Sequence, residues 1–122
     1  MSEHFSPRET RCHCGCGQDV DPRLLPALEE LRYRNGDLPL VVVSGRRCVR
    51  WNGIVHGAKK SLHVAGLAAD IRWPTRDRFE IEFFVKIARG VGFTGVGLYR
   101  DFVHLDLRHL LELPPATWDL RK

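Results

Sequence analysis

The segment Ser61-Leu62-His63-Val64-Ala65-Gly66-Leu67-Ala68-Ala69-Asp70 places a histidine and an aspartate on either side of a glycine and an apolar run. The apolar run continues to residue 73 and is closed by Pro74, which is typical of a buried strand. Gly66 lets the backbone turn closely just before that strand. The sequence therefore predicts a turn that presents the His63 imidazole, followed by a strand over residues 67–73 that presents the Asp70 carboxylate.

On the N-terminal side of this segment, the sequence predicts a helix and a second strand. Asp21-Pro22 is typical of a helix start, with the aspartate as cap and the proline at the first helical position. Leucines at positions 24, 25, 28 and 31 then recur on one face, and the helix should end near Asn35-Gly36. The run from Leu38 to Val43 predicts a buried strand that stops at Ser44-Gly45.

On the C-terminal side, the sequence predicts a helix and a hairpin. Thr75 is placed to cap a helix from about Arg76 to Arg89. Two short apolar runs, Gly95 to Tyr99 and Phe102 to Arg108, are separated only by Arg100-Asp101, which is the layout of a two-residue hairpin. The pattern as a whole predicts an α+β domain with a small antiparallel sheet flanked by about two main helices.

The composition fits a single domain over residues 1–122. A chain of 122 residues with 43% hydrophobic content can bury one ordinary core. Its apolar runs fall far short of the ~20 residues that a membrane-spanning helix needs, so no membrane partner is expected. Met1 to Arg11 is polar and lacks the apolar centre of a secretory signal peptide, so we expect synthesis in the cytoplasm without that export route.

The charge balance favours anionic partners but not nucleic acid in particular. The formal net charge is +4 and the pI is near 9.1, which suits acidic surfaces and carboxylate-rich polymers. The basic residues are scattered among acidic ones, and aromatic residues do not alternate with them as in a single-strand binder. Nucleic acid is therefore not expected as a partner.

Three residues make a candidate zinc site. Catalytic zinc usually takes three protein ligands from His, Asp, Glu or Cys and keeps a fourth position open for water. His63 and Asp70 come from the segment quoted above, and strand alternation places His104 on the polar face of the hairpin strand. The sequence therefore predicts one zinc ion with an open coordination position.

Other residues could complete a hydrolytic site. A hydrolase needs a base that takes a proton from the zinc-bound water and returns it to the leaving amine. Asp101 lies at the hairpin turn three residues before His104 and is the predicted base. Arg47 begins a long loop expected over residues 46–61, where its guanidinium could stabilise an oxyanion or hold a substrate carboxylate. Asp106 could accept a hydrogen bond from a ligand imidazole.

These motifs resemble a known family. The order Ser61-x-His63-x-x-Gly66-x-Ala68-x-Asp70, followed by Phe102-Val103-His104-x-Asp106, is similar to the zinc D-Ala-D-Ala carboxypeptidases and related murein endopeptidases, whose fold is shared by hedgehog signalling domains. Ser44-Gly45-Arg46-Arg47-Cys48 resembles the family's Ser-Gly-Tyr-Arg segment, with arginine in place of the tyrosine. Cys12 to Gly17 resembles the Cys-Gly-Cys-Gly opening of compact phage and bacterial members. The resemblance covers about Phe5 to Trp118.

The resemblance implies what the protein does. It implies zinc bound by the residues matching His63, Asp70 and His104, with Asp101 as the base. It also implies that Arg47 contacts substrate or oxyanion and that Ser61 helps to bind substrate, although Ser61 could instead only stabilise the turn before the histidine. The expected reaction is hydrolysis of murein stem peptides, as a carboxypeptidase or an endopeptidase. We expect a monomer that reaches the cell wall after lysis-type release or as a phage component.

Two alternatives stay open. The first is a binding module that keeps the fold and the zinc but has no useful turnover, as in hedgehog-type domains. The second is a small nucleic-acid module built on a four-thiolate zinc site from Cys12, Cys14, Cys16 and Cys48. Alternate-residue spacing argues against that site, because zinc ribbons use paired Cys-x-x-Cys knuckles, whereas strict alternation places the side chains on one side of an extended chain. A disulfide between Cys48 and one of the other three, or reduced thiols, is the expectation.

Overall fold

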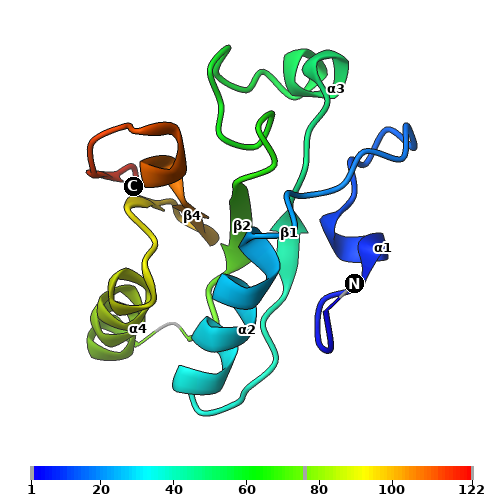
Figure 1. The fold of residues 1–122 in the computed structure, drawn as a ribbon. Helices are drawn as coiled ribbons and strands as arrows, with labels where there is room; N and C mark the ends of the chain where they lie inside the picture. Colours follow the sequence, from blue (N-terminus) through cyan, green and yellow to red (C-terminus); the bar gives the residue numbers. More distant parts are fainter. Residues whose placement is uncertain (1, 76, 122) are drawn as a thin grey trace.

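The fold is a five-stranded sheet with helices packed around it, in a computed structural model that describes residues 2–75 and 77–121 (Figure 1). This confirms the predicted α+β class with a sheet flanked by helices. The helices are α1 (Pro7–Thr10), α2 (Leu24–Arg34), α3 (Val49–Ile54) and α4 (Arg78–Val91), with one 3-10 turn, η1 (Arg108–Leu111). The strands are β1 (Val42–Ser44), β2 (Ala68–Arg72), β3 (Gly95–Leu98), β4 (Phe102–Asp106) and β5 (Ala116–Asp119).

Strand β4 lies at the centre of the sheet. The strand order is β1-β2-β4-β3-β5, and the pairs along it are antiparallel except the last. Strand β5 pairs in parallel with β3, so that Gly97 lies opposite Trp118. The sequence analysis predicted only antiparallel pairing and did not foresee β5. The four residues of β5 alternate between half-buried and exposed, and carry no apolar run that would mark a strand.

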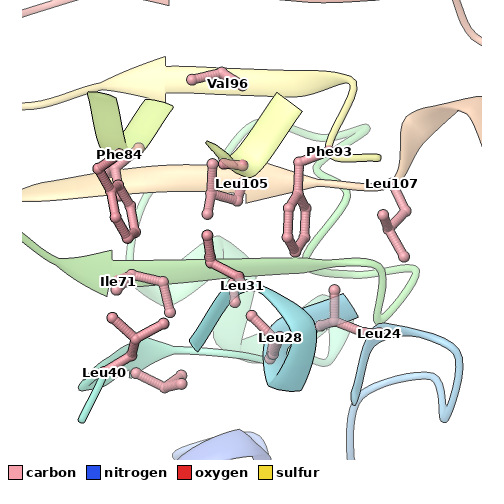
Figure 2. Packing of buried hydrophobic residues seen from close by; sticks show 14 of the residues in the cluster. Leu24, Leu28, Leu31, Leu40, Ile71, Phe84, Phe93, Val96, Leu105 and Leu107 are labelled. Atoms are coloured by element: carbon pink, nitrogen blue, oxygen red, sulfur yellow. The ribbon is translucent and has the colours of Figure 1, made fainter. Parts of the chain in front are cut away.

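One face of the sheet is covered by α2 and α4, which enclose the hydrophobic core (Figure 2). The leucines predicted on one face of the first helix are central to it, with Leu24, Leu28 and Leu31 fully buried. Ile71 from β2 and Leu105 from β4 meet them from the sheet side. Because side chains alternate along a strand, the neighbours of these two residues face the opposite side of the sheet. That opposite side carries the polar residues.

The two main helices differ slightly from their predicted bounds. Helix α2 begins at Leu24 rather than at the predicted proline, and its end at Asn35 agrees with the prediction. Helix α4 is capped by Asp77 and not by Thr75, because the Asp77 carboxylate accepts hydrogen bonds from the amides of residues 79 and 80. The predicted start at Arg76 falls on a residue that lies outside the described part of the chain.

The segments on either side of β1 also differ from expectation. The strand predicted over Leu38 to Val43 is observed only over Val42–Ser44, since Pro39 has no amide hydrogen to donate to a neighbouring strand. The loop expected over residues 46–61 contains α3, which is six residues long and too short to show a helical period. Within residues 2–75 and 77–121, no helix has both the length and the apolar character needed to span a membrane.

Candidate metal centre

The two central strands bring an aspartate and a histidine together on the polar face of the sheet. In the β2–β4 pairing, Asp70 lies directly opposite His104. Their sequence neighbours Ile71 and Val103 belong to the hydrophobic core, so the two polar side chains point to the other face. Both are buried, with 4% of Asp70 and 8% of His104 exposed. The hairpin predicted from the sequence therefore delivers His104 to the carboxylate of the preceding strand.

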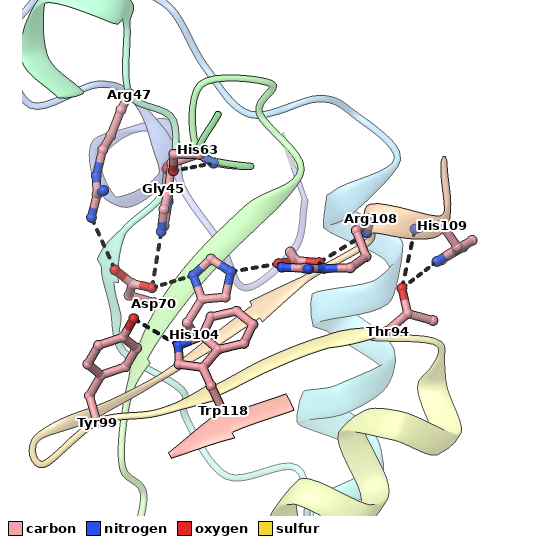
Figure 3. A network of polar contacts seen from close by, with 12 residues as sticks. Gly45, Arg47, His63, Asp70, Thr94, Tyr99, His104, Arg108, His109 and Trp118 are labelled. Carbon is pink, nitrogen blue, oxygen red and sulfur yellow. Dashed lines mark hydrogen bonds and ion pairs between the residues drawn. The ribbon is translucent and has the colours of Figure 1, made fainter. Parts of the chain in front are cut away.

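The loop before β2 supplies a second histidine. His63 is held there because its backbone carbonyl accepts hydrogen bonds from the amides of Arg47, at 3.0 Å, and Gly66, at 3.1 Å. Its Nδ1 donates to the carbonyl oxygen of Gly45 at 2.7 Å, and this hydrogen bond orients the ring so that Nε2 faces Asp70. That Nε2 lies 3.1 Å from Asp70 Oδ1 (Figure 3). His63 is only 2% exposed.

His104 is oriented in the same way by a second carboxylate. Its Nε2 donates to Asp106 Oδ2 at 2.7 Å, and its Nδ1 lies 3.1 Å from Asp70 Oδ1 (Figure 3). One ligand atom from each of His63, Asp70 and His104 therefore lies within 4.8 Å of the others. Two imidazole nitrogens and a carboxylate oxygen are the donors that zinc takes in catalytic sites, so the set fits this metal.

The protonation of these groups matches a site built for a cation. Burial favours the uncharged form of Asp70, but the hydrogen bonds from His104 and His63 outweigh burial and hold its pKa below the usual range. Burial also opposes protonation of His104, yet its hydrogen bonds to Asp106 and Asp70 raise the pKa. Metal binding would compete with protons at these donors, because zinc takes its ligands in their deprotonated form.

Asp106 is fixed by an arginine that the sequence analysis did not identify. Arg108 donates to both carboxylate oxygens of Asp106, from Nε at 3.0 Å and from Nη2 at 2.9 Å. Burial opposes ionisation of Asp106, but the hydrogen bonds from His104 and Arg108 lower its pKa to about 2. The sequence signal was the Asp-x-Arg spacing, which also occurs at exposed turns and so does not by itself indicate a site.

Strand β5 adds an aromatic wall beside the metal ligands. The Trp118 ring lies 5.3 Å from the His104 ring, and the Arg108 guanidinium lies 5.3 Å from the Trp118 ring centre. Trp118 Nε1 donates to the Tyr99 hydroxyl at 3.0 Å (Figure 3). Trp118 lies on β5, a strand that the sequence pattern did not predict.

Two glycines in β3 make room for these side chains. A Cβ atom on Gly95 would lie 2.0 Å from an oxygen of Asp106, and one on Gly97 would lie 2.4 Å from the Trp118 ring. Real Cβ atoms do not approach other atoms so closely. The strand that covers the buried carboxylate and the indole must therefore carry glycine at both positions.

Arg47 contacts one of the three candidate ligands, Asp70, directly. Its Nη2 lies 3.3 Å from Asp70 Oδ2, and its Nε donates to the Ser44 hydroxyl at 3.2 Å. A third hydrogen bond, at 3.4 Å, joins Nη1 to the side-chain oxygen of the buried Asn52. The guanidinium is thus held beside the cluster from three sides.

Of the other two predicted site residues, Ser61 lines the cavity and Asp101 does not. The Ser61 hydroxyl accepts a hydrogen bond from the His63 amide at 3.2 Å, so it stabilises the turn, and the residue also lines the cavity. Asp101 is exposed at the hairpin turn, where its carbonyl accepts a hydrogen bond from the Trp73 amide at 3.4 Å. It is not among the described residues that line the cavity, although Tyr99 and Phe102 on either side of it are.

The three candidate ligands lie in an open cavity of about 380 Å³. Besides the three ligands, its lining is rich in cationic and aromatic groups, whereas Asp70 is the only acidic residue described in it. The lining residues other than the ligands are Arg47, Val55, His56, Gly57, Ala58, Lys60, Ser61, Leu62, Tyr99, Phe102, Arg108 and Trp118. Such a lining suits a substrate that carries carboxylates.

Comparison with known proteins gives one match. The family model described as Peptidase M15 matches residues 3–106, which include the three candidate ligands, Arg47, Ser61 and Asp101. The match ends before Arg108 and Trp118, so these two cavity residues lie outside it. A search of curated proteins found no relative that matches the chain.

Proposed function

The chain belongs to the Peptidase M15 family, the zinc D-Ala-D-Ala carboxypeptidase-like family of metallopeptidases, and on this premise we propose that it hydrolyses peptide bonds in bacterial murein stems. Members of the family depend on zinc. The observation that carries the proposal is the convergence of His63, Asp70 and His104 within 4.8 Å in a cavity with a cationic lining. A zinc ligand set inside a substrate-sized cavity is the arrangement that metal-assisted hydrolysis requires.

The three candidate ligands are buried and are oriented by hydrogen bonds to other parts of the chain. His63 is fixed by a backbone carbonyl and His104 by the Asp106 carboxylate, so each presents one defined nitrogen. Zinc held by these residues would supply Lewis-acid activation of the scissile carbonyl and of water. Pre-oriented ligands lower the entropic cost of forming such a site.

The cationic residues are proposed to bind the substrate's carboxylates and the negative charge that develops during attack. Arg47 is placed beside Asp70 and presents a planar guanidinium, which can hold a carboxylate through two hydrogen bonds. Lys60 and Arg108 line the same cavity. Murein stems carry free carboxylates, so this lining supports the substrate class. Ser61, at the cavity wall, is proposed to contact the peptide backbone.

Asp101 is proposed as the general base, from its position three residues before His104. The hairpin turn that carries it borders the cavity, because Tyr99 and Phe102 on either side of it line the wall. A base must come within hydrogen-bond reach of the proton that it removes, directly or through one water molecule. The role therefore requires the Asp101 carboxylate to reach over the cavity when substrate is bound.

The decisive experiment is digestion of purified murein by the zinc-loaded protein, with soluble products identified by mass spectrometry. Released D-alanine would show a carboxypeptidase, and larger stem fragments would show an endopeptidase. The His63→Ala variant and a chelated sample should release nothing, and Asp101→Ala should release at least a hundredfold less. Arg78→Ala serves as a control and should digest murein normally, because Arg78 is the exposed first residue of helix α4 and is not among the described residues that line the cavity.

Absence of products from a protein that holds zinc at His63, Asp70 and His104 would overturn the hydrolase proposal. If that protein still sedimented with murein, the binding-module alternative would replace it. Full activity of Asp101→Ala would leave the hydrolase standing and remove Asp101 as the base.

A further inference from the structure

All four cysteines of the chain meet in one place and form a group separate from the ligand set described above. Cys12, Cys14 and Cys16 follow α1, and Cys48 is the residue that caps α3. Their four Sγ atoms all lie within 4.8 Å of one another, and all four thiols are free. Cys12 and Cys48 are buried, whereas Cys16 is exposed. None of the four belongs to the His63-Asp70-His104 set.

The expectation that alternate spacing prevents such a cluster was wrong, because the chain is not extended there. Gly15 and Gly17 adopt φ values of 82° and 87°, which turn the backbone sharply on both sides of Cys16. The Cys12 amide donates to the Gln18 carbonyl at 2.8 Å and closes the segment into a loop. The sulfur atoms of the three alternating cysteines therefore converge instead of lining one side of a strand.

The distances between the sulfur atoms fit ligands that share a metal. Cys14 Sγ lies 3.4 Å from Cys12 Sγ and 3.6 Å from Cys48 Sγ. A covalent disulfide would need about 2.05 Å. Four sulfur atoms placed tetrahedrally at about 2.3 Å from a zinc ion lie about 3.8 Å from one another. The observed separations are close to the second value.

Backbone amides already point at these sulfur atoms. The Cys48 amide donates to Cys12 Sγ, and the Trp51 amide donates to Cys48 Sγ, each at 3.3 Å. Such hydrogen bonds favour the thiolate form, which is the form that binds metals. Four thiolates at this spacing would repel one another strongly unless a cation lay between them.

The cluster joins two parts of the chain next to the candidate active site. Cys12 and Cys48 are separated by 36 positions in the sequence. Close to them, the Arg46 amide donates a hydrogen bond to the Thr10 carbonyl at 2.9 Å, so the two segments are in contact. Cys48 directly follows Arg47, whose guanidinium contacts Asp70. Anything that fixes Cys48 therefore fixes the backbone that carries Arg47.

We propose that Cys12, Cys14, Cys16 and Cys48 bind a second zinc ion in a closed structural site, which fastens the N-terminal segment to the loop carrying Arg47. Four protein ligands leave no open position, so this zinc takes no part in hydrolysis. The inference depends on the cysteine geometry alone and not on the proposed peptidase activity.

The test is metal analysis of protein purified under reducing conditions and supplied with zinc. Wild-type protein should hold two zinc ions per chain, whereas Cys14→Ser and Cys48→Ser should each hold one. His63→Ala should also hold one, because it loses the other site. His13→Gln is the matched control, because it removes an imidazole from the same loop, next to Trp51, without removing a proposed ligand. This variant should still hold two zinc ions.

Cobalt substitution identifies which ion is lost without relying on the folding of a cysteine variant. Cobalt bound by thiolates gives an intense sulfur-to-metal charge-transfer band, which should appear in wild type and in His63→Ala. The proposal is overturned if the reduced wild-type protein binds one ion and shows no such band. It is also overturned if the cysteine site holds iron, or if the native protein contains a disulfide between these cysteines. Failure to digest murein would leave every one of these readouts unchanged.

Discussion

Replacing Asp106 by asparagine tests how His104 is held in place. The Asp106 side chain is fully buried, and its Oδ2 accepts hydrogen bonds from both His104 Nε2, at 2.7 Å, and Arg108 Nη2, at 2.9 Å. Its Oδ1 accepts from the Arg108 amide and from Arg108 Nε, at 3.1 and 3.0 Å. Asparagine keeps one acceptor oxygen and presents an NH₂ group at the other position. A donor would then face His104 Nε2, which is also a donor.

The magnitude follows from these four hydrogen bonds. Loss of a carboxylate that orients a metal-binding histidine typically weakens metal affinity 10–100-fold, so we expect a fall of that size for zinc. Arg108 would also lose its buried partner, and breaking a buried ion pair from one side costs about 3–5 kcal/mol. Both effects share one cause, and neither needs a change in the metal ligands themselves.

The assay is competition for zinc with a chelator of known affinity, combined with urea unfolding of the metal-free protein. The chain supplies a matched control, because Asp119-Leu120-Arg121 repeats Asp106-Leu107-Arg108 in sequence and in hydrogen bonding. Asp119 is exposed and is not among the described residues that line the cavity, so Asp119→Asn should leave zinc affinity unchanged. If Asp106→Asn bound zinc within twofold of wild type while remaining folded, the orienting role of Asp106 would be refuted.

Three further predictions concern stability. The pKa of Asp106 is lowered to about 2 from an ordinary 3.8, so between these pH values the folded protein binds fewer protons than the unfolded chain. The free energy of unfolding of the metal-free protein should therefore fall by roughly 2 kcal/mol as the pH falls from about 4 to 2. Urea unfolding measured at a series of pH values would contradict this if the free energy stayed constant. Gly97→Ala should cost about 1–3 kcal/mol and alter the fluorescence of Trp118, because the new Cβ meets the indole; an unchanged spectrum and urea midpoint would argue against the close packing. Leu31→Ala should cost about 2–5 kcal/mol in urea unfolding, whereas Tyr33→Ala on the exposed face of the same helix should have little effect; equal losses would place the core elsewhere.

Much of the fold could be predicted from the sequence, because most of its helices and strands carry a local hydrophobic pattern. The leucines of α2 recur at helical spacing, and the run that forms β2 is closed by a proline, so both elements were predicted close to their observed bounds. The hairpin of β3 and β4 followed from two runs separated by Arg100-Asp101. Helix α3 and strand β5 are too short to show a hydrophobic period in the sequence. Strand β5 is defined by its pairing with the edge of β3, which is a contact between distant parts of the chain.

The candidate site divides in the same way. His63, Asp70 and His104 could be identified from residue type, spacing and strand alternation, and the structure brings them together. Arg108 could not, because its importance comes from the burial of the carboxylate that it pairs with, which is a property of the folded chain. The cysteine cluster was misjudged, since the alternating pattern was taken to imply an extended backbone and two glycines turn it instead.

The central place of β4 in the sheet determines when the protein can fold during synthesis. Strand β4 (Phe102–Asp106) lies between β2 and β3 and pairs with both, so β2 has no partner on that side until the ribosome has made residues 102–106. Helix α2 and the Asp70 strand are made much earlier and must wait with apolar surface exposed. Because His104 arrives on this late strand, the complete ligand set exists only after the hairpin has closed. Zinc held by this set would therefore bind only after β4 has been made and has paired with β2.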